Sequence, residues 1–443
     1  MLTAAWAALA AALFVLSPSV GAGAAALPVL AYAALSGLRH IPRSVFLPGT
    51  ALVALMIVAE PWANSTVQAL GAANLTSPTG ALKAAVSAAA VAGAVVLRVR
   101  GRWLSFPATL IAAYGVVTVA GGIEGAALHS AVLRMVRLVL IVAACDVVAS
   151  RIGVRRTIRL VAAFSVAICA TSAVGYLAGV SPLIDRRLSG YPLPLAANEI
   201  GLLAAAGLIS LIAVAPPRGR RWLLAAPALL LLFALALSGS RTSWGGFAVA
   251  LVAYAIRSRS RVWLGTISAV TVALALLAIF GAVTGHDAIR QALTRQGETS
   301  ISLSGNGRAA EWHAALAANR GFEVLTGQGL QAKTVFIEVP FPQDAPVDGS
   351  WHAAYLSGGL LGVLLLLVAV CAALGSAWRN REPAVGALVL FLVASSVLTN
   401  VINDLSVGLV ILVAMTAAGR QRARPSSASA VRAREASPAS SAA

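Results

Sequence analysis

Charged residues are scarce in this chain. Only 11% of its 443 residues are Asp, Glu, Lys or Arg, whereas a typical soluble domain has about 25%. Apolar residues make up 59% of the sequence, and they fall into many separate runs of about 20 residues, the length of a helix that crosses a bilayer. The composition therefore excludes an ordinary soluble protein and favours a chain that crosses a lipid bilayer several times.

Alternation of apolar and polar residues is absent from these runs, and the sequence has no internal repeat. A closed β-barrel requires such alternation, whereas a helix satisfies its own backbone hydrogen bonds inside the bilayer. The sequence therefore predicts an all-α, polytopic integral membrane protein with about 12–14 transmembrane helices.

Cysteine and lysine are also scarce. Cys145, Cys169 and Cys371 all lie inside apolar runs, so they provide neither a disulfide framework nor the spacing of a metal site. Lysine occurs only at Lys83 and Lys333, and the net charge of +18 comes from arginines that cluster in short loops. Membrane topology explains that clustering, so the lipid bilayer is the expected partner and no nucleic acid is expected.

Basic loops alternate with weakly charged loops along the chain, which predicts that both termini are cytoplasmic. The transmembrane helical domain is predicted to cover residues 1–418. A large external loop over residues 284–350 is inserted within it, and the Ser-, Ala-, Pro- and Arg-rich tail over residues 419–443 is predicted to be disordered.

The external loop is too long for a simple connector. Its segment NGRAAEWHAALAANRGF predicts a short helix that is capped by Asn306 and ended by Gly321. Arg308 and Trp312 are four residues apart and share one face of that helix. Arg308 either forms an anion site with the free N–H groups of the first turn or is a solvated loop arginine.

Two more polar residues lie where apolar runs meet the external face. Arg241 lies on the side where arginine is disfavoured, and His352 opens the apolar run HAAYLSGGLLGVLLLL. An imidazole there can accept or relay a proton near neutral pH. The simpler alternatives are a snorkelling arginine and an aromatic belt formed by Trp351 and Tyr355 around the histidine.

Arg134 and Arg137 lie in the outer part of a predicted span, where cations are costly and face a cavity or a partner. Asp146 lies toward the cytoplasmic end and is not an obvious partner, so a functional role and a structural ion pair both remain open. Metal-binding spacings such as HExxH are absent, and no metal site is expected.

Four motifs follow one another across the external loop and its flanks: SGSRTSWGGFAVAL, SGNGRAAEWHAAL, GQGL and DGSWHAAYLSGGLLG. Their order and topology resemble the O-antigen ligase and O-antigen polymerase superfamily of bacterial envelope glycan transferases. The resemblance covers about residues 241–362, and the earlier segment PLAANEIGLLAA is similar to a family span that contains an asparagine.

The resemblance implies a glycosyltransferase of the bacterial inner membrane with its active site on the periplasmic face. Family members transfer or polymerise a glycan from a polyisoprenyl-diphosphate donor onto a hydroxyl of a glycan or glycolipid acceptor, without a metal or another cofactor. Arg241 and Arg308 would contact the donor phosphates, and His352 would orient or deprotonate the acceptor. The family often has Asn where this chain has Ala353, so ligase and polymerase both remain open.

Five further residues are expected to bind substrate because they could reach the same external level: Arg134, Arg137, Trp312, Trp351 and Tyr355. The alternative function is a transporter or flippase of lipid-linked sugars. Transporters are built from internal repeats with sites near the bilayer midplane. This chain has no repeat, and its most suggestive charges are predicted to be external, which favours the enzyme.

Overall fold

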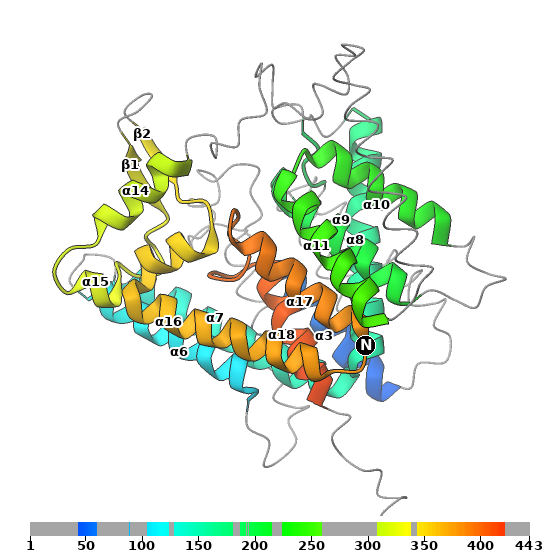
Figure 1. The fold of residues 1–443 in the computed structure, drawn as a ribbon, viewed down its shortest axis with the longest axis horizontal. Coiled ribbons are helices and arrows are strands. Elements are labelled where there is room, and N and C mark those ends of the chain that lie inside the picture. The colour runs from blue at the N-terminus through cyan, green and yellow to red at the C-terminus, as the bar shows by residue number, and fades with distance from the viewer. Residues whose placement is uncertain are drawn as a thin grey trace, which may run out of the picture.

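The computed structural model describes residues 43–59, 88, 104–123, 128–179, 187–191, 193, 195–214, 224–258, 308–337 and 343–420. Within these ranges the chain forms twelve helices and one two-stranded sheet, which confirms the predicted helical class (Figure 1). The predicted tail lies outside the described residues from residue 421 onward, as do residues 284–307 of the predicted loop.

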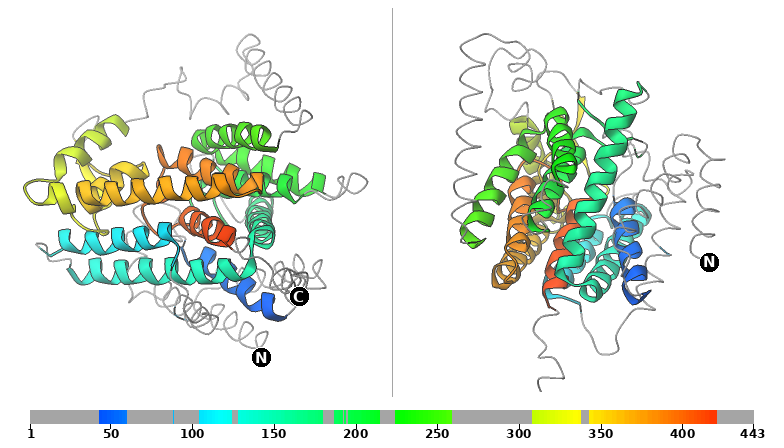
Figure 2. Two further views of the ribbon diagram at one scale, coloured as in Figure 1. Left: turned by 60° about the horizontal axis from the view of Figure 1, so that its bottom comes forward. Right: turned by 90° about the vertical axis from the view of Figure 1, so that its right-hand side faces the viewer.

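Ten of the described helices form the main body of the fold. They are α3 (Arg43–Ala59), α6 (Phe106–Gly121), α7 (Leu128–Ile152), α8 (Val154–Leu177), α9 (Ala197–Ala213), α10 (Ala225–Ser238), α11 (Arg241–Ser258), α16 (Ser350–Arg379), α17 (Pro383–Ser396) and α18 (Val407–Ala418). Figure 2 shows α6, α7 and α16 running side by side, with α6 in contact with both of the others. On the other side α8 and α10 pack against α9, while α17 and α18 lie between the two groups.

Two described helices, α8 and α16, are long and apolar enough to cross a membrane. Six other described helices or helix segments are equally apolar but only 10–17 residues long. The predicted number of 12–14 spans includes segments outside the described residues and stays a prediction.

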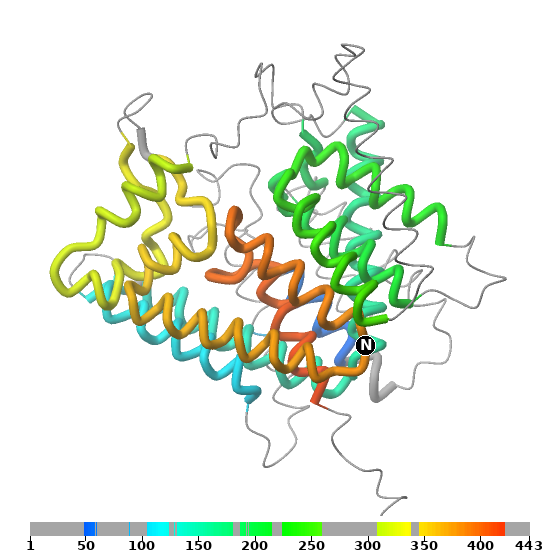
Figure 3. Tube along the Cα trace, viewed as in Figure 1, coloured from blue at the N-terminus to red at the C-terminus, as the bar shows by residue number. Residues whose placement is uncertain are grey.

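The described part of the predicted external loop forms a small module at the N-terminal end of α16, which the trace in Figure 3 also shows. It consists of α14 (Arg308–Ala318), α15 (Glu323–Thr326) and the antiparallel strands β1 (Thr334–Ile337) and β2 (Gln343–Pro346). Buried Ala315, Val335 and Leu356 join these elements to α16. The predicted loop helix is present and ends at Ala318, before Gly321 with its φ of 55°. The strands were not predicted, because four residues are too few for a clear pattern.

A break in α16 attaches the module to the main helical body. Gly359 has a φ of 59° inside the helix, a conformation that glycine adopts at little cost. The carbonyls of Leu356 and Ser357 accept hydrogen bonds of 2.8 and 2.9 Å from the N–H groups of Gln328 and Gly329. The break therefore lets the loop replace hydrogen bonds that a continuous helix would make within itself.

Replacing Gly359 should weaken this attachment. A Cβ at Gly359 would overlap the backbone of Leu325, and a left-handed non-glycine residue alone costs about 1–2 kcal/mol. Gly359→Ala should therefore lower the thermal unfolding midpoint of the detergent-solubilised protein. Gly375→Ala on the same helix is the matched control, since no atom lies within 4 Å of its added Cβ. Equal midpoints for the two variants would contradict this account.

Candidate functional site

Three predicted site residues meet where α14 docks on the start of α16. The Trp312 ring stacks on the His352 ring with centroids 4.4 Å apart and an angle of 2° between the planes. Trp312 Nε1 donates a hydrogen bond of 2.7 Å to the Asp348 carbonyl. Arg308 Nε and Nη2 lie 3.3 and 3.2 Å from Asp348 Oδ2. Asp348 thus fixes both Arg308 and Trp312, and we name these four residues the Asp348 cluster.

Gly349 makes this close packing possible. Its φ is 96°, which a side chain rarely adopts. A Cβ there would lie 2.8 Å from the Val397 carbonyl oxygen, 3.5 Å from His352 Nδ1 and 3.6 Å from Trp312 Nε1. The glycine before α16 therefore turns the chain so that Asp348 faces α14 while His352 stays under Trp312.

Two properties of the cluster bear on its chemistry. The Arg308 side chain is only 16% exposed, so its charge acts with little screening by water. His352 Nδ1 is buried and has no hydrogen-bond partner among the described residues. The site therefore combines a fixed cation with an imidazole nitrogen that no described residue bonds.

Glu311 is a member of this site that the sequence did not single out. Burial raises the pKa of its carboxyl group and nearby Asp348 raises it further, while the Asp348 backbone hydrogen bond and Arg308 oppose the shift. Its Oε2 is buried without a hydrogen-bond partner in the described part of the chain. Its position three residues after Arg308 and one before Trp312 was the available signal, because all three share a helix face.

Arg134 and Arg137 face an acidic partner that lies far away in sequence. Both interact electrostatically with Asp404, which also forms an ion pair with Lys333. Arg134 Nη1 also donates a hydrogen bond of 3.4 Å to the Leu330 carbonyl. Although burial alone would raise the pKa of Asp404, Lys333 and Arg134 hold it below its ordinary value. Asp146 instead pairs with Arg420, so it is not the partner of these arginines.

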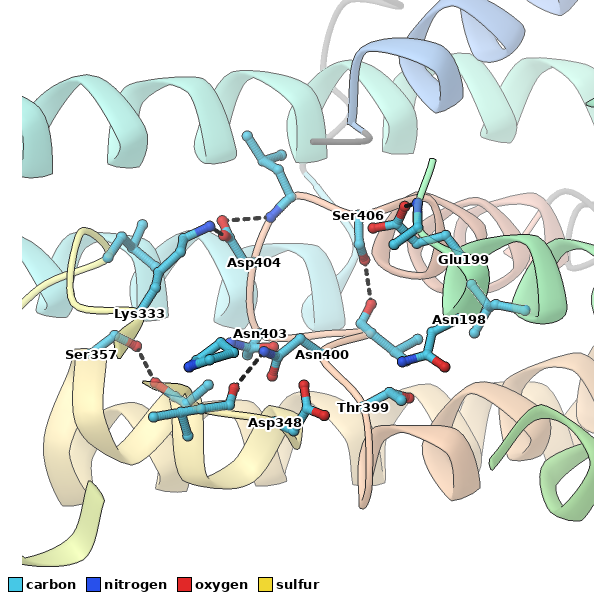
Figure 4. Close-up of a pocket in the computed structure, with 18 of the residues that line it drawn as sticks. Asn198, Glu199, Lys333, Asp348, Ser357, Thr399, Asn400, Asn403, Asp404 and Ser406 are labelled. Carbon is cyan, nitrogen blue, oxygen red and sulfur yellow. Dashed lines mark hydrogen bonds and ion pairs between the residues drawn. The ribbon is translucent and has the colours of Figure 1, made fainter. Parts of the chain in front are cut away.

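A cavity of about 200 Å³ lies between the Asp348 cluster and Asp404. Asp348 forms part of its wall, together with Lys333 and Asp404 (Figure 4). The other polar lining groups come from Asn198 and Glu199 of α9, from Ser357 of α16 and from the segment from Thr399 to Ser406. The cavity therefore joins the cluster on α14 and α16 to the charges around Asp404.

The protein family described as O-antigen ligase matches residues 226–357. This segment resembles O-antigen ligases. The match agrees with the resemblance seen in the sequence, and it indicates a glycosyltransferase-like enzyme that ligates glycans of the cell envelope. No curated protein matches the chain.

The O-antigen ligase segment contains six of the eight predicted site residues, while Arg134 and Arg137 precede it. Arg241, which is exposed, begins α11 and has no hydrogen bond or ion pair with any described residue. Arg187 binds the end of α10 just before Arg241. Its Nε donates a hydrogen bond of 2.7 Å to the Ser238 carbonyl, and its Nη2 donates one of 2.6 Å to Asn198 Oδ1. Arg241 is not among the residues that line the cavity, and it has no contact with the Asp348 cluster in the described part of the chain.

The three aromatic residues that were predicted to bind substrate have different surroundings. Trp312 is the ring that covers His352, whereas Trp351 packs against the main helical core. Adjacent helical residues point in directions about 100° apart, so Trp351 and His352 face different surroundings. Tyr355 is half-buried, and its carbonyl accepts a bond of 2.7 Å from Asn319 Nδ2. Within the described ranges, His, Cys, Asp and Glu form no group of three suited to a metal ion.

The raised pKa of Glu311 predicts a pH-dependent stability. The folded state penalises the ionised carboxylate, so wild-type stability falls as pH rises from the ordinary value of 4.5 through the raised pKa. Glu311→Gln keeps an acceptor for the Asp348 N–H but carries no charge. Its unfolding midpoint should therefore exceed that of wild type slightly at pH 8 and match it at pH 4. An equal difference at both pH values would contradict the raised pKa.

Proposed function

We propose that this protein is an integral-membrane glycosyltransferase of the bacterial inner membrane. It transfers or polymerises a glycan from a polyisoprenyl-diphosphate donor onto an acceptor hydroxyl at the outer membrane face, without a metal. The observation that carries the proposal is the stacking of His352 on Trp312 beside Arg308, within the O-antigen ligase match. A proton acceptor and a fixed cation are the two groups that this reaction needs.

The exposed surface of the helices supports a position in the bilayer. Large apolar side chains are exposed on α10, α11 and α16: Leu229, Leu232, Phe233, Val249, Val252, Ile256, Leu360, Leu361, Leu364, Leu367 and Val368. Exposing such surface to water costs about 25 cal/mol per Å², whereas hydrocarbon accepts it. His352 lies in the first turn of α16, so the site lies near one end of this span, where the diphosphate of a lipid-anchored donor would be.

The proposed reaction is a single displacement at the anomeric carbon of the donor sugar. The acceptor oxygen forms a bond to that carbon while the bond from the carbon to the diphosphate oxygen breaks. The hydroxyl proton passes to His352, and the polyisoprenyl diphosphate leaves with the electron pair. Trp312 holds the imidazole plane in one orientation, since the two rings are parallel within 2°.

Arginines stabilise the charge that develops on the leaving diphosphate. A guanidinium has five N–H donors in a fixed fork, so Arg308 can keep its bonds to Asp348 Oδ2 and still bind phosphate oxygens. Arg241 begins a helix, where free N–H groups add to its positive charge.

The experiment that tests this function is glycan transfer in proteoliposomes with a lipid-diphosphate glycan and a panel of acceptors. His352→Ala should lower the transfer rate by about 10²–10⁴, the usual contribution of general-base catalysis, while donor affinity stays unchanged. Arg308→Lys should instead weaken donor binding, since a point charge does not reproduce the fork. His313→Ala, at an exposed position of α14, is the matched control and should be fully active.

Two outcomes would contradict the proposal. Wild-type transfer rates in His352→Ala would reduce the histidine to a packing residue. Movement of lipid-linked glycan across the vesicle membrane, without transfer to any acceptor, would favour the transporter alternative.

A further inference from the structure

Large apolar side chains of the loop module are exposed where the module meets the main helical body. Phe322 and Leu325, in the segment of residues 320–325 that leads from α14 into α15, are 61% and 44% exposed. Ile123, Leu360 and Leu361 of the neighbouring helices or their ends are exposed as well. Single exposed apolar residues are ordinary, but a group of them in one place marks an interaction surface.

The 320–325 segment lies directly against the helix ends that carry the other members of this group. A Cβ at Gly359 of α16 would overlap the backbone of Leu325, and one at Gly121 of α6 would overlap the backbone of Gly327. Figure 1 shows α15 beside the ends of α6 and α16, with β1 and β2 at the other end of the module. The exposed side chains of the segment therefore lie next to the exposed apolar surface of α16.

The length of α16 indicates the depth of this segment in a bilayer. The helix ends at Arg379, and neighbouring Trp378 is 59% exposed, as expected of an aromatic residue at a membrane interface. The chain from Gly359 to Arg379 advances by about 30 Å at 1.5 Å per residue, which is the thickness of the hydrocarbon core. The break at Gly359, and with it Leu325, therefore lies where the opposite leaflet's hydrocarbon meets the headgroups.

Arg320 adds a cation to the same segment. The residue is exposed, and its guanidinium forms no ion pair with a described residue. The one nearby carboxylate, from Glu323, accepts a hydrogen bond of 3.4 Å from the Arg320 backbone N–H. An arginine beside exposed aromatic and aliphatic side chains is typical of segments that lie in the membrane interface, where the cation binds lipid phosphate.

We propose that the 320–325 segment anchors the loop module to the outer leaflet of the bilayer. Phe322 and Leu325 lie among the upper parts of the lipid chains, and Arg320 binds lipid phosphates. Lipid is the partner because the segment adjoins the apolar surface that α16 exposes over the length of a hydrocarbon core. The inference rests on the bilayer position given under the proposed function, and it extends that position to the loop that carries Arg308 and Trp312.

Fluorescence quenching in liposomes tests the anchor without any transfer reaction. The fluorophore NBD is attached to Phe322→Cys in the full chain with Cys371→Ala, since the other two cysteines are buried. In vesicles that contain phosphatidylglycerol, spin-labelled lipids should quench this label strongly and aqueous iodide weakly. Phe336→Cys is the matched control, because Phe336 is 59% exposed on β1 of the same module. Its label should be quenched mainly by iodide.

Two outcomes would overturn the proposal. The first is equal iodide quenching of the labels at the Phe322 and Phe336 positions in variants that unfold at the same temperature. The second is a label at the Phe322 position that is shielded from iodide in native membranes but not in vesicles of lipid and purified protein. That result would show that a protein, and not lipid, covers the segment.

A charge reversal tests the phosphate contact of Arg320. Arg320→Glu in the labelled Phe322→Cys chain should lower the ratio of lipid to iodide quenching by up to about fivefold, as expected for the loss of one basic residue near an anionic surface. His313→Glu places the same charge at an exposed position of α14 and should leave the ratio unchanged. Equal ratios for Arg320→Glu and the unmodified arginine would remove Arg320 from the anchor.

The anchor and the proposed transfer reaction can fail independently. In an active transfer assay, Phe322→Ser should raise the KM for the lipid-linked donor and leave kcat unchanged, because it changes the position of the module in the bilayer and no reacting group. Phe336→Ser should change neither constant. A lipid-shielded label in a protein that transfers no glycan would leave the anchor intact and remove only the proposed function.

Discussion

The docking of α14 onto the start of α16 is the interaction on which the site depends. Asp348 makes it possible, because its carboxylate holds Arg308 and its carbonyl accepts the Trp312 hydrogen bond. Gly349 then turns the chain into α16 so that His352 meets the indole ring. Without this docking, the His352 imidazole and the Arg308 guanidinium would not be held in one site.

The loop module has a second attachment to α16, at the break around Gly359. The carbonyls of Leu356 and Ser357 bond to the loop, and the Ser357 hydroxyl lies 2.8 Å from the buried Tyr114 hydroxyl of α6. The module is therefore attached to α16, which carries His352, and α16 is in turn bonded to α6. Rigid support of this kind is what precise positioning of reacting groups requires. The neighbouring cavity shares Asp348 with the cluster, so one aspartate belongs to both.

Local patterns in the sequence were sufficient to predict the helices, but they did not predict the short strands or the contacts between elements. The alanine-rich segment predicted α14, and the spacing of Arg308 and Trp312 predicted their common face, both of which the structure confirms. The short strands and the stacking of Trp312 on His352 were missed, and substrate binding by Trp312 and Trp351 stays a prediction. Asp404 pairs with Lys333 across 71 residues, and no local rule predicts such a contact. Arg241 matches the family motif, but its convergence with Arg308 stays a prediction.

The central claim is that Trp312 and His352 act as one unit in glycan transfer. A double-mutant cycle on the transfer rate tests it most directly, using Trp312→Ala, His352→Ala and the double variant in proteoliposomes. Residues that act as a unit are strongly non-additive, so the double variant should be about as slow as His352→Ala alone, with a coupling energy of about 1–3 kcal/mol. If the two single effects multiply in the double variant, the stacked pair is not a functional unit and the account is contradicted.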